Sequence, residues 1–158
     1  MLLFSSAGIK HQLDFVRLSE HREYLPLAAK WAEDEWGYIR NKGIEYRTEV
    51  LAALAHNVYI GTFANQPVVM FALLEHELPH SKELMYVYVD KNYRGLGFAK
   101  QIIEEAKRLT VEAECSLILL DTLKPNLNHM YEKYGAKVVC EGKLFAHPTD
   151  VLSMSIQI

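Results

Sequence analysis

Apolar and polar positions along the chain form short segments that predict seven strands and four helices. Strands are predicted where apolar, β-branched or aromatic residues cluster between turn residues, at 14–18, 58–63, 68–74, 84–89, 117–120, 136–140 and 151–156. Helices are predicted where apolar residues recur every three to four positions, at 19–37, 46–55, 98–112 and 127–134. Ser19 is the expected N-cap of the first helix, and the turn 64–67 is expected to join two strands as a hairpin.

The order of these segments is β-α-α-β-β-β-α-β-α-β-β. Hairpins in the first half and crossovers in the second half predict an α/β (α+β) fold, with helices on the faces of a mixed sheet. The 158 residues contain no repeat, no low-complexity segment and no linker rich in Pro, Gly or Ser. We therefore expect residues 1–158 to form a single domain.

Composition and charge narrow the class of protein. Half of the residues are apolar and 23% are charged, so a core can form without disulfides or a metal. The formal charge of −3 gives no basic excess, and we expect no nucleic-acid partner. Cys115 and Cys140 lie in no zinc-type spacing, so no metal is expected. The N-terminal apolar stretch is too short for a signal peptide or membrane span, which favours a cytoplasmic protein without membrane contact.

A glycine-rich loop lies between a predicted strand and a predicted helix and indicates a phosphate-binding site. The segment 86–103 reads YVYVDKNYRGLGFAKQII. Gly95 and Gly97 allow the backbone to approach a ligand, the N-terminus of the following helix adds partial positive charge, and Arg94 adds a cation. An ordinary glycine-rich turn between a strand and a helix is the alternative interpretation.

Two nucleotide-binding motifs fit this loop poorly. A Walker A loop requires Gly-Lys-Ser/Thr, whereas Gly97 is followed by Phe98 and Ala99. A dinucleotide fingerprint requires a third Gly or Ala at position 100, which is Lys100. Residues 94–99, RGLGFA, instead match the R/Q-x-x-G-x-G/A signature of Gcn5-related N-acetyltransferases, the GNAT family. The second match is MYEKYGA at 130–136, which resembles the family's L/F-Y-x-x-x-G-F stretch, with Ala136 in place of the Phe.

The resemblance to the GNAT family extends over the order of elements from residue 14 to 156. It implies a mixed, mostly antiparallel sheet of six to seven strands with splayed central strands, flanked by about four helices. It also implies an enzyme that moves an acetyl group from acetyl-CoA to a primary amine of a small molecule or peptide. A catalytically weak member that binds acyl-CoA as a sensor or interaction module is the alternative, as is transfer of a longer acyl group.

The resemblance further implies which residues bind acetyl-CoA. The pantetheine arm would bond to the backbone of strand 84–89, the diphosphate to the N–H groups of the loop, and the thioester carbonyl would lie near the N–H of Val87. Asn126 is favoured over Asn128 as a pantetheine ligand, and the alternative role is helix capping. The residues expected at the acetyl-CoA site are Val87, Tyr88, Val89, Arg94, Gly95, Leu96, Gly97, Phe98, Ala99, Asn126 and Tyr131.

Two residues are candidates for proton transfer. Tyr131 falls on the family's catalytic tyrosine position and would protonate the leaving thiolate, although it could instead pack on the pantetheine arm. Glu83, four residues before Val87, would be the general base, or an exposed carboxylate at a strand end. Glu75, His76 and Glu77 are weaker candidates near the same cleft. Tyr86 and Tyr88 should face away from Met85 and Val87 unless a bulge intervenes.

The acceptor side is expected at the first two helices, the hairpin and the last strands. Its acidic and aromatic residues would suit a cationic amine, or the tryptophans would pack in the core beneath a solvated helix face. These residues are Trp31, Glu33, Asp34, Glu35, Trp36, Tyr38 and Glu45. An exposed last strand would permit a homodimer.

Overall fold

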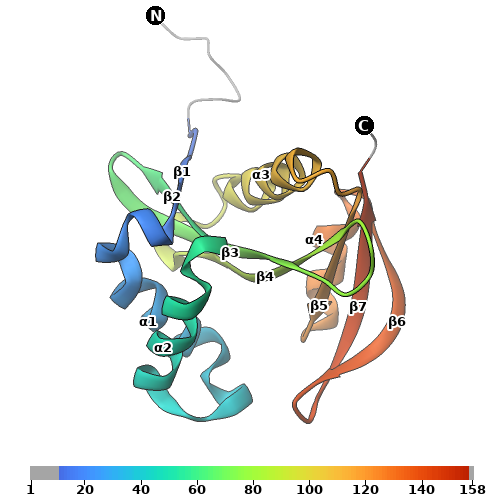
Figure 1. Ribbon diagram of the computed structural model, residues 1–158, viewed down its shortest axis with the longest axis horizontal. Coiled ribbons are helices and arrows are strands. Elements are labelled where there is room, and N and C mark those ends of the chain that lie inside the picture. The colour runs from blue at the N-terminus through green and yellow to red at the C-terminus, as the bar shows by residue number, and fades with distance from the viewer. Residues whose placement is uncertain (1–10, 157–158) are drawn as a thin grey trace, which may run out of the picture.

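The computed structural model describes residues 11–156, which form a seven-stranded mixed sheet with helices on both faces (Figure 1). The strands run in the spatial order β1-β2-β3-β4-β5-β7-β6, and β4 and β5 form the one parallel pair of this sheet. The strands are β1 (Asp14–Arg17), β2 (Val58–Phe63), β3 (Gln66–Glu75), β4 (Ser81–Val89), β5 (Leu117–Thr122), β6 (Ala136–Leu144) and β7 (His147–Ser155). The helices are α1 (Leu25–Arg40), α2 (Gly43–Leu54), α3 (Phe98–Glu112) and α4 (Asn128–Glu132). The predicted fold class is confirmed.

Each face of the sheet has its own apolar core. On one face, α3 buries Phe98, Ile102, Ile103 and Ala106 against the strands, because these residues recur on one side of the helix. On the other face, α1 and α2 pack Ala28, Trp31 and Leu51, among others, against β2, β3 and β4. Burial of these two layers holds the sheet between its helices.

The two central strands diverge soon after they meet. β4 and β5 are paired from Ser81 to Glu83 with Leu117 to Leu119, and the pairing goes no further. The rest of β4 stays with β3, while β5 continues with β7. The central strands are therefore splayed, as predicted, and the cavity described below opens between them.

A β-bulge in β4 changes which side chains share a face. Met85 pairs with Ala72 and Tyr88 with Met70, so β4 holds one more residue than β3 in this interval. Tyr86 takes a φ of 55°, a left-handed conformation that is rare for a residue with a large side chain. Met85 and Tyr86 consequently both pack on the core beneath α1 and α2, whereas Val87 packs on the opposite core. Strict alternation is therefore wrong at Tyr86, and the bulge is the reason.

The first helix differs most from the prediction. Two single 3-10 turns, Leu18–Glu20 and Arg22–Tyr24, replace its expected first turns, and Ser19 makes no capping bond. α1 begins at Leu25, where Pro26 occupies a favoured first-turn position. It continues past Gly37 to Arg40, because the left-handed Asn41 closes it by donating its N–H to the Gly37 carbonyl.

Other boundaries move by a few residues. α2 begins at Gly43 rather than at 46. Thr48 lies inside the helix, where its hydroxyl donates to the Ile44 carbonyl. The hairpin turn contains two residues, Ala64 and Asn65, both with positive φ, so β3 already begins at Gln66. The segment expected as a helix at 127–134 contains the shorter α4, and the last two strands are longer than predicted because they pair with each other over nearly their full length.

Candidate active site

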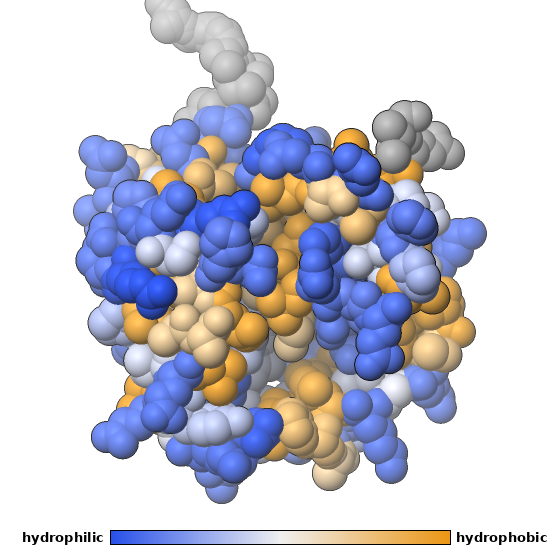
Figure 2. Space-filling view, viewed as in Figure 1, coloured by the Kyte–Doolittle hydropathy of each residue, from blue (hydrophilic) through white to orange (hydrophobic). Residues whose placement is uncertain are grey.

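A cavity of about 860 Å³ lies where β4 and β5 separate and passes from one sheet face to the other. Its walls come from β4, the loop before α3, the end of β5, α4, the C-terminal half of α1, α2 and the end of β6. Figure 2 shows an apolar furrow on this face of the molecule, between two mainly hydrophilic flanks. The fold therefore brings residues from Glu35 to Phe145 together around one cavity.

The glycine-rich loop forms one end of the cavity. Gly95 and Gly97 both have a φ of 85°, and a Cβ at either position would meet nothing within 4 Å, so the glycines serve conformation and access rather than close packing. Gly97 is the N-cap of α3 and supplies no side-chain cap. The first N–H groups of α3 have no partner within the helix, and they carry its positive dipole end toward the cavity. The loop thus has the form of an anion cradle.

Arg94 is held at the rim of this cradle. Its Nε donates to the carbonyl oxygen of Val89 at 3.0 Å, and its guanidinium lies 5.6 Å from the ring centroid of Tyr88. The side chain is exposed, and its two terminal nitrogens make no hydrogen bond within the described part of the chain. These nitrogens remain available to an anion in the loop.

The residues predicted to bind acetyl-CoA converge on this cavity, with one exception. Leu96 is exposed and does not line it. The predicted residues that do line it are Val87, Tyr88, Val89, Arg94, Gly95, Gly97, Phe98, Ala99, Asn126 and Tyr131, together with Glu83.

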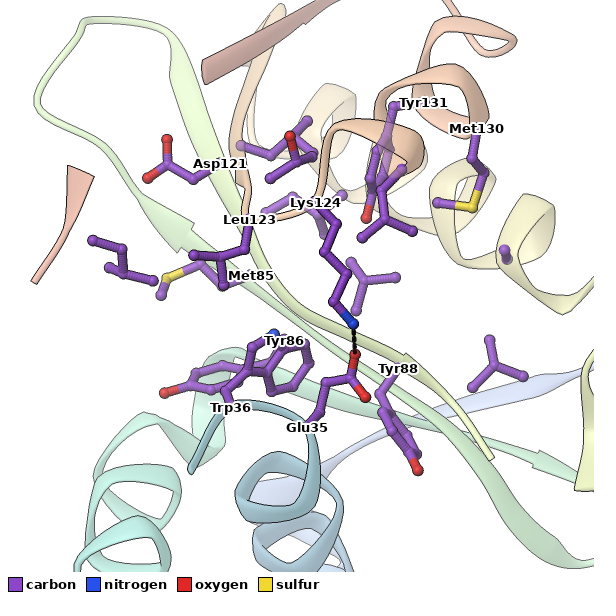
Figure 3. A pocket seen from close by; sticks show the side chains of 18 of the residues that line it. Glu35, Trp36, Met85, Tyr86, Tyr88, Asp121, Leu123, Lys124, Met130 and Tyr131 are labelled. Carbon is purple, nitrogen blue, oxygen red and sulfur yellow. Dashed lines mark ion pairs between the residues drawn. The ribbon is translucent and has the colours of Figure 1, made fainter. Parts of the chain in front are cut away.

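Tyr131 points into the cavity from α4 (Figure 3). Its side chain is 6% exposed, and burial raises the pKa of Tyr131 to about 12. The phenol therefore keeps its proton at neutral pH and is a hydrogen-bond donor, not a base.

The two candidate asparagines have different surroundings. Asn128 is buried, shares a hydrogen bond with the Thr122 hydroxyl, and donates from Nδ2 to Asp150 at 2.8 Å. It joins α4 to β5 and β7. Asn126 lines the cavity, and no side-chain cap is made at the 3-10 turn that contains it. The role of Asn126 as a pantetheine ligand stays a prediction.

Two carboxylates stand at the point where β4 and β5 separate. Glu83 pairs with Leu119 in register, and Asp121 lies two residues further along β5, so both side chains project from the same sheet face. Burial, and then the charge of Asp121, raise the pKa of Glu83, while His76 opposes the shift. Burial likewise raises the pKa of Asp121. Asp121 was not among the predicted site residues. The signal that could have identified it is the alternation in 117–122, which puts Asp121 on the other sheet face from the apolar Leu120.

An aromatic cluster forms the wall on the side of α1. The ring of Trp36 meets Tyr86 edge-on at 5.5 Å between centroids, and Trp31 lies beside Tyr88 at 5.4 Å. Trp31 is buried in the core as the packing alternative proposed, whereas Trp36 lines the cavity.

Arg47 connects this cluster to α2. Its side chain is buried, and its nitrogens donate to the Glu33 carboxylate at 3.3 Å, the Tyr86 hydroxyl at 3.2 Å and the Trp36 carbonyl at 3.2 Å. A buried arginine with three partners fixes α1, α2 and the bulge of β4 relative to one another. No sequence pattern identified this residue, because a single arginine in a helix is ordinarily solvated.

Replacing Arg47 with Met should lower the free energy of unfolding by about 2–3 kcal/mol, since Glu33 and the Tyr86 hydroxyl would lose their partner while mostly buried. Urea denaturation would measure the change. Lys30→Met removes the exposed Lys30–Asp34 pair of α1, the helix that also carries Glu33, and serves as the control, with no measurable change expected. Equal free energies of unfolding for both variants would show that the contacts of Arg47 with Glu33 and Tyr86 do not stabilise the fold.

The predicted acidic rim is only partly at the cavity. Glu35 lines it and lies 4.0 Å from the Nζ of Lys124, so this ion pair spans the cavity between α1 and the segment after β5 (Figure 3). Tyr38 also lines it. Glu33 is engaged by Arg47, Asp34 by Lys30, and Glu45 is exposed outside the lining.

No helix within residues 11–156 is long and apolar enough to cross a membrane.

Comparison with known proteins identifies the family of the central segment. A family model described as an acetyltransferase (GNAT) domain matches residues 47–135, which contain the glycine-rich loop and Tyr131. The search among curated proteins found no significant match.

Solved structures share the fold over nearly the whole chain. An aminoglycoside 6'-N-acetyltransferase complexed with coenzyme A is 12% identical, with a TM-score of 0.77 over 92% of this chain and 98% of that one. An acetyltransferase of the GNAT family from Staphylococcus aureus Mu50 is 15% identical, with a TM-score of 0.74 over 92% and 99% of the two chains. A spermidine N-acetyltransferase chimera from Vibrio cholerae and hSSAT is 16% identical, with a TM-score of 0.71 over 91% and 95%. At these identities, the similarity concerns the fold.

Proposed function

Because this chain belongs to the GNAT acetyltransferase family, we propose that it is an N-acetyltransferase that moves an acetyl group from acetyl-CoA to a primary amine. The observation that carries the proposal is one continuous cavity with the glycine cradle at one end and the separated strands at its centre. A cradle at the surface alone would bind an anion, whereas a cavity continuing past Tyr131 to two carboxylates also provides room for a reaction.

The residues present fit acetyl-CoA as a substrate. The free N–H groups at the start of α3 and the terminal nitrogens of Arg94 would hold the diphosphate. The backbone of β4 from Val87 to Val89 faces the space that β5 has left, so a pantetheine arm would bond there as an added strand does. Asn126 would contribute a side-chain contact to the same arm.

The reaction is attack of a neutral amine on the thioester, which forms a C–N bond and releases CoA as the C–S bond breaks. The bulge leaves Val87 outside the paired register of β3, and its N–H would donate to the thioester oxygen as negative charge develops there. Glu83 would take the proton of the incoming ammonium. Its raised pKa makes it a better base than an ordinary surface glutamate.

Tyr131 would donate a hydrogen bond to the departing sulfur. A pKa of about 12 lies well above the roughly 8.5 of a thiol, so complete proton transfer from this phenol costs about 5 kcal/mol. Hydrogen bonding to the thiolate, with the proton then supplied by solvent, is the role that this pKa supports.

Turnover distinguishes an enzyme from an acyl-CoA-binding sensor of the same fold. Purified protein with acetyl-CoA and a mixed panel of primary amines should release free CoA thiol and yield acetylated amine, identified by mass spectrometry. Calorimetric titration should show binding of acetyl-CoA and none of NAD or ATP. Binding without turnover on any amine would favour the sensor, and absence of binding would refute both functions.

A further inference from the structure

The acceptor half of the cavity has no free cation within the described residues. Arg47 is held by Glu33 and Tyr86, and Lys124 is paired with Glu35 across the cavity. Arg40 lies over the ring of Phe145, 4.2 Å from its centroid, and 5.2 Å from that of Tyr46. These positive charges are already balanced or stacked, so they offer little to an anionic group of an acceptor.

Glu83 and Asp121 are the opposite case. Both line the cavity, and both project from the sheet face that carries α1 and α2. His76 is close enough for its charge to act on both, but among residues 11–156 neither carboxylate makes an ion pair or a side-chain hydrogen bond. Two neighbouring carboxylates that no lysine or arginine pairs with attract one ammonium group, which relieves the repulsion between them. They stand beside the bulge of β4, where the acetyl group would be presented.

Beside the carboxylates, the wall of this half is mainly aromatic and apolar. The side chains of Trp36, Met85 and Tyr86 line this half together with the two carboxylates, and Figure 3 shows all three together with Asp121. The wall continues along α2 with Val50 and Leu54. It also includes Leu144 at the end of β6 and Phe145 in the following turn. Such a wall provides burial for a hydrocarbon group.

Contacts across the cleft limit the length of an acceptor. Tyr38 meets the ring of His147 edge-on at 5.2 Å, and Arg40 stacks on Phe145, so the end of α1 touches the β6–β7 turn. These contacts close a side of the cavity through which an extended peptide would have to continue. The space therefore suits a small molecule.

We propose that the acceptor is a small primary amine carrying one apolar or aromatic group, whose ammonium is held between Glu83 and Asp121 while the group packs on Trp36, Tyr86 and Phe145. This proposal rests on the proposed acetyltransferase function. One carboxylate accepts one proton from the ammonium, the nitrogen lone pair forms the bond to the acetyl carbon, and the thiolate of CoA leaves and is protonated by solvent. Asp121 acts on the amine directly, so it contributes to acceptor binding and not to that of acetyl-CoA.

The test compares five acceptors at saturating acetyl-CoA: 2-phenylethylamine, L-phenylalanine, spermidine, kanamycin and the tripeptide Phe-Ala-Ala. L-phenylalanine differs from 2-phenylethylamine by a single carboxylate, and so isolates the charge of the subsite. The value of kcat/KM for 2-phenylethylamine should exceed that for each of the other four by at least about tenfold, because a carboxylate would be repelled and polycations or peptides would leave polar groups against the apolar wall.

Variants separate the carboxylate pair from the apolar wall. Asp121→Asn should raise KM for 2-phenylethylamine about tenfold and leave the dissociation constant of acetyl-CoA unchanged. It should also lower the ratio of kcat/KM for 2-phenylethylamine to that for L-phenylalanine. Phe145→Ala should reduce the preference for 2-phenylethylamine over n-propylamine. Glu104→Gln and Leu78→Ala, exposed residues that do not line the cavity, are the matched controls and should change neither ratio.

The outcomes distinguish this proposal from the one on which it rests. Turnover with spermidine, kanamycin or the tripeptide as the best substrate would overturn the apolar-amine proposal and leave the acetyltransferase function intact. An unchanged acceptor ratio in Asp121→Asn would remove the carboxylate pair from the acceptor site. Binding of acetyl-CoA without acetylation of any amine would refute both.

Discussion

Replacing Gly97 with Asp should weaken acetyl-CoA binding at least about 100-fold. The new carboxylate would project near the N-terminus of α3, in the space where the diphosphate is expected, because nothing lies within 4 Å of a Cβ at this position. Two like charges about 4 Å apart repel by about 4 kcal/mol at an effective dielectric constant of 20, which exceeds a factor of 100 in affinity. Calorimetric titration with acetyl-CoA measures the change.

Gly97→Asn is the matched control for this charge. Asn has nearly the shape of Asp, carries no charge, and tolerates the left-handed φ of 85° better than most residues. We expect Asn to weaken binding by no more than about tenfold, and the two variants to unfold at similar temperatures. S-acetylpantetheine lacks the diphosphate, so its turnover should be equal in the two variants. Equal affinities of both variants for acetyl-CoA would mean that the loop does not bind the diphosphate.

The parts of the site that depend on local sequence could be predicted. α3 begins at Phe98 and ends at Glu112, as expected, because a left-handed glycine and a strong 3.6-residue apolar period define it without help from the rest of the chain. The position of the glycine-rich loop and that of Tyr131 were also predictable, because each belongs to a short sequence motif. The order of strands and helices was also predictable, since each segment has its own pattern.

The parts that depend on tertiary contacts could not be predicted. The bulge at Tyr86 lies just past the point where β5 departs from β4, and alternation in 84–89 gives no sign of it. Arg47 looks like a solvated helix residue until Glu33, Trp36 and Tyr86 are brought around it. Asp121 acquires a role only when β4 and β5 lie side by side and Glu83 becomes its neighbour.

Replacing Tyr131 with Phe should lower kcat about 100-fold and leave acetyl-CoA binding within about threefold of the original. The substitution removes one hydroxyl that points into the cavity and keeps the ring that packs on the core. A single donor aimed at a group on which charge develops typically contributes this much to the rate. Steady-state kinetics with saturating 2-phenylethylamine or another accepted amine, together with calorimetry, separates the two effects.

The pH dependence of kcat identifies the form of Tyr131 that acts. Because burial raises the pKa of Tyr131 to about 12, the phenol remains protonated at every pH below that value, and it can donate throughout the neutral and mildly alkaline range. Ionisation of Tyr131 should therefore not affect kcat between about pH 7 and pH 10, and the pH profiles of the original enzyme and of Tyr131→Phe should have the same shape in this range. A loss of kcat in this range, absent from the variant, would mean that the bound complex lowers the pKa of Tyr131 and that full proton transfer takes place.

Tyr59→Phe distinguishes catalysis from packing. Tyr59 is also buried, stacks on Phe71 in the same core and does not line the cavity, so loss of its hydroxyl should leave kcat unchanged. If Tyr131 only packs against the pantetheine arm, Tyr131→Phe should behave like Tyr59→Phe, since both keep their rings. If its hydroxyl stabilises the departing thiolate, the two variants should differ in kcat alone, because in the proposed site the cradle and β4 bind acetyl-CoA and that hydroxyl does not.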